Sequence, residues 1–138
     1  MGRVYVEDFE ICGAKPYEGG RMTFDSYERV YHRDGYRCVY CGKYLLLDFD
    51  SWQSIHTDHL VPSSKGGSDA DDNMVTSCAV CNTLKGTFAP ENDIETLGRR
   101  NYIQAMREHI QARRAQRMRA FFELVEQMNS RLPPIGEP

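Results

Sequence analysis

Apolar residues recur at the spacing of a helical face in two parts of the chain. Between positions 22 and 33 they stand at 24, 27, 30 and 31, which predicts a helix. Thr23 suits the N-cap of this helix, and Asp34-Gly35 is a stop signal. From about 94 to 128 apolar residues stand at 103, 106, 110, 118, 121, 125 and 128. This second stripe predicts one long helix or two helices in series.

Shorter patterns lie between these two parts. Residues 53–61 alternate loosely and are β-favourable around Ile55 and Thr57, so we expect a strand that ends near His59. Residues 63–73 are rich in Ser, Gly and Asp and predict a loop. A second short strand is expected at 74–76, and then a short helix at 81–85 that Gly86 ends. The pattern predicts an α+β fold in which strand, loop, strand and helix follow one another.

The length and composition fit one small domain with additions at both ends. At 138 residues, with 41% hydrophobic and 27% charged residues, the chain can bury a modest core. We expect an irregular N-terminal arm at 1–21, a domain at 22–89 and a helical extension at 90–138. No apolar run approaches the ~20 residues that span a membrane. The start of the chain lacks a signal-peptide pattern, so a cytoplasmic location is expected.

The charge is unevenly distributed along the chain. Residues 99–131 contain eight Arg and three Glu, whereas residues 36–98 contain four basic and nine acidic residues. The Arg-rich stretch, which includes Arg113, Arg114 and Arg117, is either the solvated face of a helix or a surface that contacts nucleic-acid phosphates. We expect Phe121, Phe122 and Val125 to pack against the core or another subunit. The extension could therefore also join two copies in a homodimer.

Four of the five cysteines form two C-x-x-C pairs that are 36 residues apart, namely Cys38, Cys41, Cys78 and Cys81. Four thiolates suit tetrahedral Zn²⁺ and leave no open position for water. The alternatives are four unliganded core cysteines, or a redox pair that lacks its usual βαβ context. In so small a domain, a zinc ion is expected to supply much of the folding free energy. Cys12 stands alone, and we expect no chemical role for it.

The polar residues between the cysteine pairs are ambiguous when each is taken alone. Asp58-His59 is typical of a surface or capping pair. Asn73 alone suits a turn, and Asn82 alone could cap a helix. His56 stands two residues before Asp58 and shares its side of the expected strand, where outer-shell and inert roles are equally open.

Taken together, these residues resemble the HNH endonucleases, in the subgroup whose ββα-metal motif lies within a Cys₄ zinc site. The resemblance covers about residues 27–87 and rests on the run D-H-L-V-P-S-S-K-G-G-S-D-A-D-D-N-M-V-T-S-C-A-V-C-N-T-L-K-G and the approach D-G-Y-R-C-V-Y-C-G. It implies metal-dependent hydrolysis of DNA that leaves a 5′-phosphate. The ends, 1–20 and 90–138, carry no signature of this family.

The resemblance also implies a role for each matching residue. His59 matches the general base that activates water, and Asp58 matches a ligand of the catalytic divalent metal. Asn73 matches the residue that holds the loop so that the histidine is correctly aimed. Asn82 stands where the last histidine of the name often stands, which makes this an H-N-N variant. Its carboxamide oxygen can still ligate a hard cation such as Mg²⁺ or Mn²⁺.

Three further side chains, those of Lys85, His32 and His109, could lie near the site or at the surface. Lys85 could reach the substrate phosphate or be a solvated lysine at a helix end. His32 and His109 are expected on helix surfaces.

Two other functions compete with the nuclease. One is a non-catalytic zinc-ribbon-like module that binds DNA or protein, and the joint presence of the four polar residues speaks against it. The other is a zinc nucleobase deaminase, which needs H-x-E and P-C-x-x-C. Here Leu60-Val61 follows His59, and Ser77 precedes the second cysteine pair, so both deaminase motifs are missing.

Overall fold

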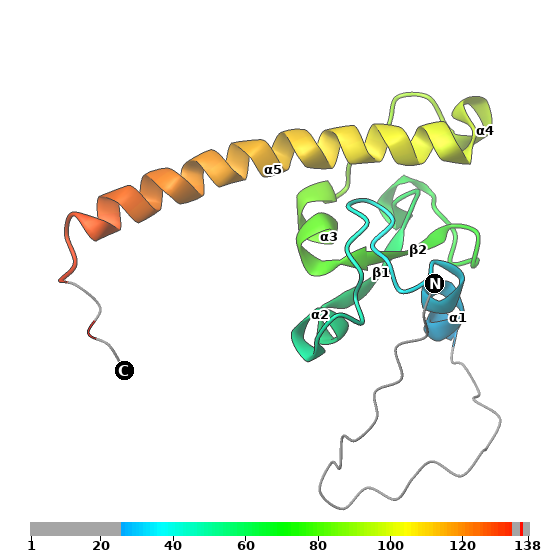
Figure 1. Cartoon of the computed structure of the whole chain (residues 1–138). Helices are drawn as coiled ribbons and strands as arrows, with labels where there is room; N and C mark the ends of the chain where they lie inside the picture. Colours follow the sequence, from blue (N-terminus) through cyan, green and yellow to red (C-terminus); the bar gives the residue numbers. More distant parts are fainter. Residues whose placement is uncertain (1–25, 134–135, 137–138) are drawn as a thin grey trace, which may run out of the picture.

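The computed structural model describes residues 26–133 and residue 136. A small two-stranded sheet lies among short helices, and a long C-terminal helix runs along one side and projects beyond the domain (Figure 1). The expected arm at 1–21 and Cys12 lie outside the described residues, as does the start of the helix predicted from position 22. None of the helices in the described part could cross a membrane.

The sheet pairs β1 (Ile55–His59) with β2 (Met74–Cys78) in antiparallel register, with Ile55 opposite Cys78 and His59 opposite Met74. The predicted strand end at His59 is confirmed. β2 extends two residues beyond the predicted 74–76, and all five of its residues are buried. Helices on both sides of β2 explain this burial, because α1 (Ser26–Arg33) and α3 (Ala79–Lys85) each contact it.

Helix α1 and the turn after it join the sheet through specific hydrogen bonds. Val30 is buried, and the Tyr31 hydroxyl lies 2.7 Å from Oγ1 of Thr57 on β1. Asp34 accepts a 2.8 Å hydrogen bond from the backbone N–H of Thr76 on β2. The predicted stop at Asp34-Gly35 is confirmed, and Gly35 has a positive φ of 63°. These contacts hold the segment that comes directly before the first cysteine pair.

A short helix, α2 (Phe49–Gln53), precedes β1 in a segment where the sequence pattern predicted no helix. Asp48 caps it, because its Oδ1 accepts a 2.7 Å hydrogen bond from the backbone N–H of Ser51. Phe49 and Trp52 are exposed on this helix, and their rings contact each other.

The C-terminal part forms two helices in series, which confirms the second of the two alternatives predicted for it. Gly98, with φ 76°, separates α4 (Ile94–Leu97) from α5 (Arg99–Asn129). The first half of α5 packs on the domain through three buried side chains, those of Tyr102, Met106 and Ile110. The second half projects past the domain (Figure 1).

Two expectations for the extension are wrong in part. Phe121, Phe122 and Val125 do not pack in the core but are exposed, although Phe121 lines a surface pocket together with residues of α3. His109 is only partly exposed. Its ring stacks on Phe88 with centroids 3.8 Å apart and planes within 3°, and its Nε2 is buried. His109 therefore helps to seat α5 on the segment after α3.

Candidate metal centre and reaction site

The four paired cysteines meet where β2 passes into α3. Their Sγ atoms all lie within 4.8 Å of one another, and those of Cys41 and Cys78 are 3.9 Å apart. Zn–S bonds of about 2.3 Å in a tetrahedron place sulfurs roughly 3.8 Å apart. The donor set and its spacing therefore fit a Zn²⁺ ion.

A backbone hydrogen bond closes the turn that carries the first cysteine pair. Gly42 has φ 76°, and its N–H donates a 2.8 Å hydrogen bond to the carbonyl of Cys38. Hydrogen bonds from the Cys78 and Cys81 thiols lower the pKa of Cys38, so Cys38 readily provides the thiolate that a metal binds. The Arg114 guanidinium lies 3.5 Å from Sγ of Cys81, where its charge stabilises a thiolate. One of the three arginines predicted to contact nucleic acid thus faces the metal centre.

The carboxylate of Asp58 is buried where three elements meet. The Tyr40 hydroxyl, from within the first cysteine pair, donates a 2.5 Å hydrogen bond to its Oδ2. The Lys85 ammonium, from α3, lies 2.8 Å from Oδ2 and 3.1 Å from Oδ1. Burial, and then the Asp58 charge, raise the pKa of Tyr40, so its hydroxyl stays protonated and remains a donor.

Lys85 is not the solvated lysine that one reading of the sequence suggested. Its side chain is only 1% exposed, and its ammonium also donates a 2.5 Å hydrogen bond to the carbonyl of His59. The ammonium is directed inward because the Asp58 carboxylate lies beneath the last turn of α3. In this arrangement it contacts both residues of the Asp58-His59 dipeptide and does not lie at the surface, where a phosphate would be met.

His59 stands at the end of β1, where its ring is partly exposed. Its Nε2 lies 2.7 Å from Oδ1 of Asp69, a loop residue whose side chain is 93% exposed. Sequence reasoning did not single out Asp69. The only signal was the acidic composition of the loop, which does not show which carboxylate meets the histidine.

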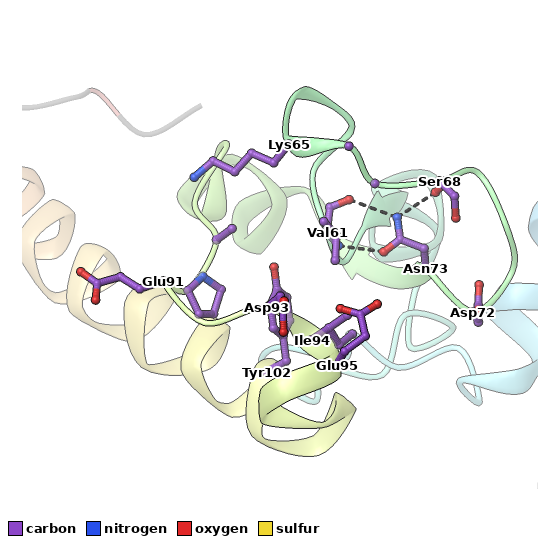
Figure 2. Close-up of a pocket in the computed structure, with 14 residues that line it drawn as sticks. Val61, Lys65, Ser68, Asp72, Asn73, Glu91, Asp93, Ile94, Glu95 and Tyr102 are labelled. Atoms are coloured by element: carbon purple, nitrogen blue, oxygen red, sulfur yellow. Dashed lines mark hydrogen bonds between the residues drawn. The ribbon is translucent and has the colours of Figure 1, made fainter.

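Asn73 closes the loop that carries Asp69. Its Oδ1 accepts a 2.8 Å hydrogen bond from Val61 N–H, and its Nδ2 donates to the carbonyls of Val61 and Ser68 at 3.1 and 2.7 Å. Figure 2 shows these three bonds across the neck of the loop. Because Asn73 is buried, its amide is a fixed part of the loop and not an exposed turn residue.

Asn82 lies inside α3 and faces β1. It does not cap the helix, because the N-cap is Cys78. Its Nδ2 lies 3.0 Å from Nδ1 of His56, so this contact does not use Oδ1 of Asn82. His56 and Asp58 share one side of β1 because alternate residues of a strand do. Both Asp58 and Asn82 carry oxygen atoms of the kind that a hard divalent cation prefers, and the Asp58 oxygens contact Tyr40 and Lys85 in this structure.

A cavity of about 480 Å³ adjoins the loop but is separate from this cluster. Figure 2 shows Asn73, Ser68 and Lys65 on one side of it and the linker to α4 on the other. Neither Asp58, His59 nor Asn82 lines it. The Asp58 side chain lies instead on the side of β1 that faces Lys85 of α3, whereas the His59 ring contacts Asp69 of the loop.

Three other arginines of α5 differ in their surroundings. Arg107 holds the helix against the cysteine turn, because its guanidinium donates to the carbonyl of Val39 at 2.7 and 3.0 Å. Arg113 and Arg117 are exposed.

One part of the chain matches a known protein family. Residues 38–88 match the model of the family described as HNH endonuclease. The searches of curated proteins and of solved structures gave no match. The matched segment begins at Cys38 and runs past the end of α3, so it contains the four cysteines, both strands and the loop between them. Residues 38–88 of this chain are therefore similar to an HNH endonuclease domain.

Proposed function

We propose that the chain is a metal-dependent endonuclease that hydrolyses phosphodiester bonds of DNA, and that Zn²⁺ occupies its Cys₄ site. The observation that supports this most directly is the placement of Asp58-His59. The dipeptide ends β1, is held by Lys85 of α3 through the Asp58 carboxylate and the His59 carbonyl, and is anchored to the cysteine turn through Tyr40. A zinc-ribbon module that only binds a partner would not require this set of polar groups around one strand end.

His59 is the proposed general base. With Asp69 accepting a hydrogen bond from Nε2–H, the lone pair lies on Nδ1, which takes the proton of the attacking water. The Asp69 carboxylate then stabilises the imidazolium that forms. Asn73 contributes indirectly, because it closes the loop that brings Asp69 to His59.

Asp58 and Asn82 are the proposed ligands of the catalytic cation, for which Mg²⁺ or Mn²⁺ is the best match. When bound, such a cation polarises the phosphate and neutralises the leaving 3′ oxygen. The oxygen donors of these two residues come from facing elements, β1 and α3, so the fold brings them to one side of the sheet.

The exposed Arg113 and Arg117 are the proposed phosphate contacts on α5. Such contacts position the duplex and carry no sequence information. Arg114 was predicted from the sequence as a phosphate contact together with these two residues, but its contact with Cys81 favours a role at the zinc site. A homodimer through the exposed end of α5 stays a prediction.

The test is cleavage of supercoiled plasmid by the purified, zinc-loaded full chain, with and without Mg²⁺ or Mn²⁺. We expect nicked or linear product only when the divalent cation is added, with 5′-phosphates at the new ends. Binding of DNA without cleavage under any of these conditions would instead support the zinc-ribbon-like module.

A further inference from the structure

The proposed mechanism leaves one buried charge without a role, namely the ammonium of Lys85. A lysine at the end of a helix normally keeps its charge in water, and a buried ammonium is costly unless it is paired and hydrogen-bonded. Here it is fully paired. It contacts both oxygens of Asp58 and the carbonyl of His59, so it joins the proposed cation ligand and the proposed base.

The same contacts occupy much of the Asp58 carboxylate. An ionised carboxylate has about four acceptor sites, and Tyr40 and Lys85 together make three contacts with this one. A divalent cation at Asp58 would also lie next to the positive charge of Lys85. That repulsion is strong because charges in a protein interior are weakly screened.

We propose that Lys85 is an internal counter-cation of Asp58, which holds the Asp58-His59 dipeptide in place and keeps the affinity of the site for a divalent cation low. Lys85 is thus a positioning residue, and Tyr40 assists it by occupying Oδ2 of the same carboxylate. This inference rests on the proposed function, because it assigns Asp58 to the catalytic cation. It predicts that cation affinity and catalytic rate change in opposite directions when the lysine charge is removed.

The test is Mn²⁺ binding, measured by electron paramagnetic resonance on the zinc-loaded full chain without DNA. We expect Lys85→Met to bind Mn²⁺ at least tenfold more tightly than wild type, because the competing charge is gone. Lys85→Arg retains the charge and should keep the wild-type affinity. Lys65→Met removes the same charge from an exposed site and should also leave it unchanged. At saturating Mn²⁺, single-turnover cleavage by Lys85→Met should fall at least tenfold, because His59 has lost its backbone anchor.

A lysine that only stabilises the fold would give a different result, since its loss would weaken cation binding and cleavage together. Tyr40→Phe is the second test, because it removes one contact to Asp58 without changing a charge or the shape of the core. We expect Tyr40→Phe to retain zinc and to bind Mn²⁺ a few times more tightly.

Unchanged or weaker binding in folded Tyr40→Phe and Lys85→Met overturns the inference, while cleavage by wild type leaves the proposed function intact. A zinc-loaded wild type that neither binds Mn²⁺ nor cleaves DNA overturns both.

Discussion

The side-chain amide of Asn73 pairs with the backbone of Val61 in both directions, accepting from its N–H at 2.8 Å and donating to its carbonyl at 3.1 Å. Val61 is the second residue after β1, and Asn73 is the last before β2. The pair therefore closes the loop between the strands in the way that a backbone ladder would. Asp69, the partner of His59, lies in that loop.

Asn73→Asp should separate the loop from the strand end. A carboxylate keeps an acceptor for Val61 N–H but cannot donate, so it would face the carbonyls of Val61 and Ser68. We expect a loss of about 1–3 kcal/mol in unfolding free energy and a lower cleavage rate, measured by urea unfolding and plasmid nicking. Asn92→Asp, on an exposed residue, is the matched control. Equal stability of the two variants would contradict the role given to the Asn73 amide.

Gly67 is required in the same loop because the backbone passes very close to it. A Cβ built on Gly67 would lie 1.7 Å from the carbonyl oxygen of Val61 and 2.9 Å from Nδ2 of Asn73. We expect Gly67→Ala to destabilise the domain by about 2–4 kcal/mol and to lower cleavage, measured by thermal unfolding and plasmid nicking. A Cβ on the neighbouring Gly66 meets nothing within 4 Å. Gly66→Ala carries only the strain of φ 84°, about 1 kcal/mol, and should be the milder change.

Loss of the metal from the Cys₄ site should unfold the domain. The four cysteines link the first turn, the end of β2 and the start of α3, and a site of this kind contributes directly to folding free energy. We expect Cys81→Ser to lose bound zinc and cooperative unfolding, measured by zinc content and circular dichroism. Cys12→Ser should retain one zinc per chain. A folded, zinc-free Cys81→Ser protein would argue against the structural role.

Acid should weaken the packing of α5 through His109. Burial, and then the charge of Arg113, lower the pKa of His109 below its usual value of 6.5. The unfolded chain therefore takes up a proton on this ring more readily than the folded one. Stability from this group is present above pH 6.5 and is lost as the pH falls from there through the lowered pKa.

The matched variant is His109→Phe, which keeps the stack on Phe88 and cannot titrate. We expect urea unfolding to show wild type losing more stability than the variant between pH 8 and pH 5. Parallel pH profiles for the two proteins would show that His109 does not titrate on unfolding.

DNA binding should depend on salt through the exposed arginines of α5. Replacing Arg113 and Arg117 by Gln should reduce the slope of log affinity against log salt concentration by about 1 to 2, because each phosphate contact releases counterions. Fluorescence anisotropy with a labelled duplex measures this slope. Arg131→Gln, which lies beyond the end of α5, is the control. An unchanged slope in the double variant would remove α5 from the DNA surface.

Local patterns in the sequence were enough to predict much of the fold. The alternation that ends at His59, the paired cysteines and the stop at Gly86 each depend on a few neighbouring residues, and the structure has all three. Helix α2 was missed because its five residues form no amphipathic pattern, although Asp48 was a visible cap.

The roles of the site residues could be predicted less well from the sequence, because they depend on contacts between residues that are far apart in the chain. Lys85 is buried only because Asp58, 27 residues earlier, lies beneath it, and no local pattern distinguishes it from a solvated lysine. Asp69 meets His59 only through the path of the loop, which the Asn73 hydrogen bonds define. His56 was left open between two roles, and its contact with Asn82 places it beside a proposed cation ligand.

The central claim is tested most directly by single-turnover cleavage of supercoiled plasmid by His59→Ala in Mg²⁺. The variant should retain zinc and the wild-type unfolding profile, since His59 is a partly exposed ring at a strand end. The control is His32→Ala, an exposed residue of α1. We predict that His59→Ala cleaves at least 100-fold more slowly than wild type, while His32→Ala cleaves at the wild-type rate. Cleavage by folded, zinc-loaded His59→Ala at the wild-type rate would contradict the assignment of His59 as the base and the mechanism built on it.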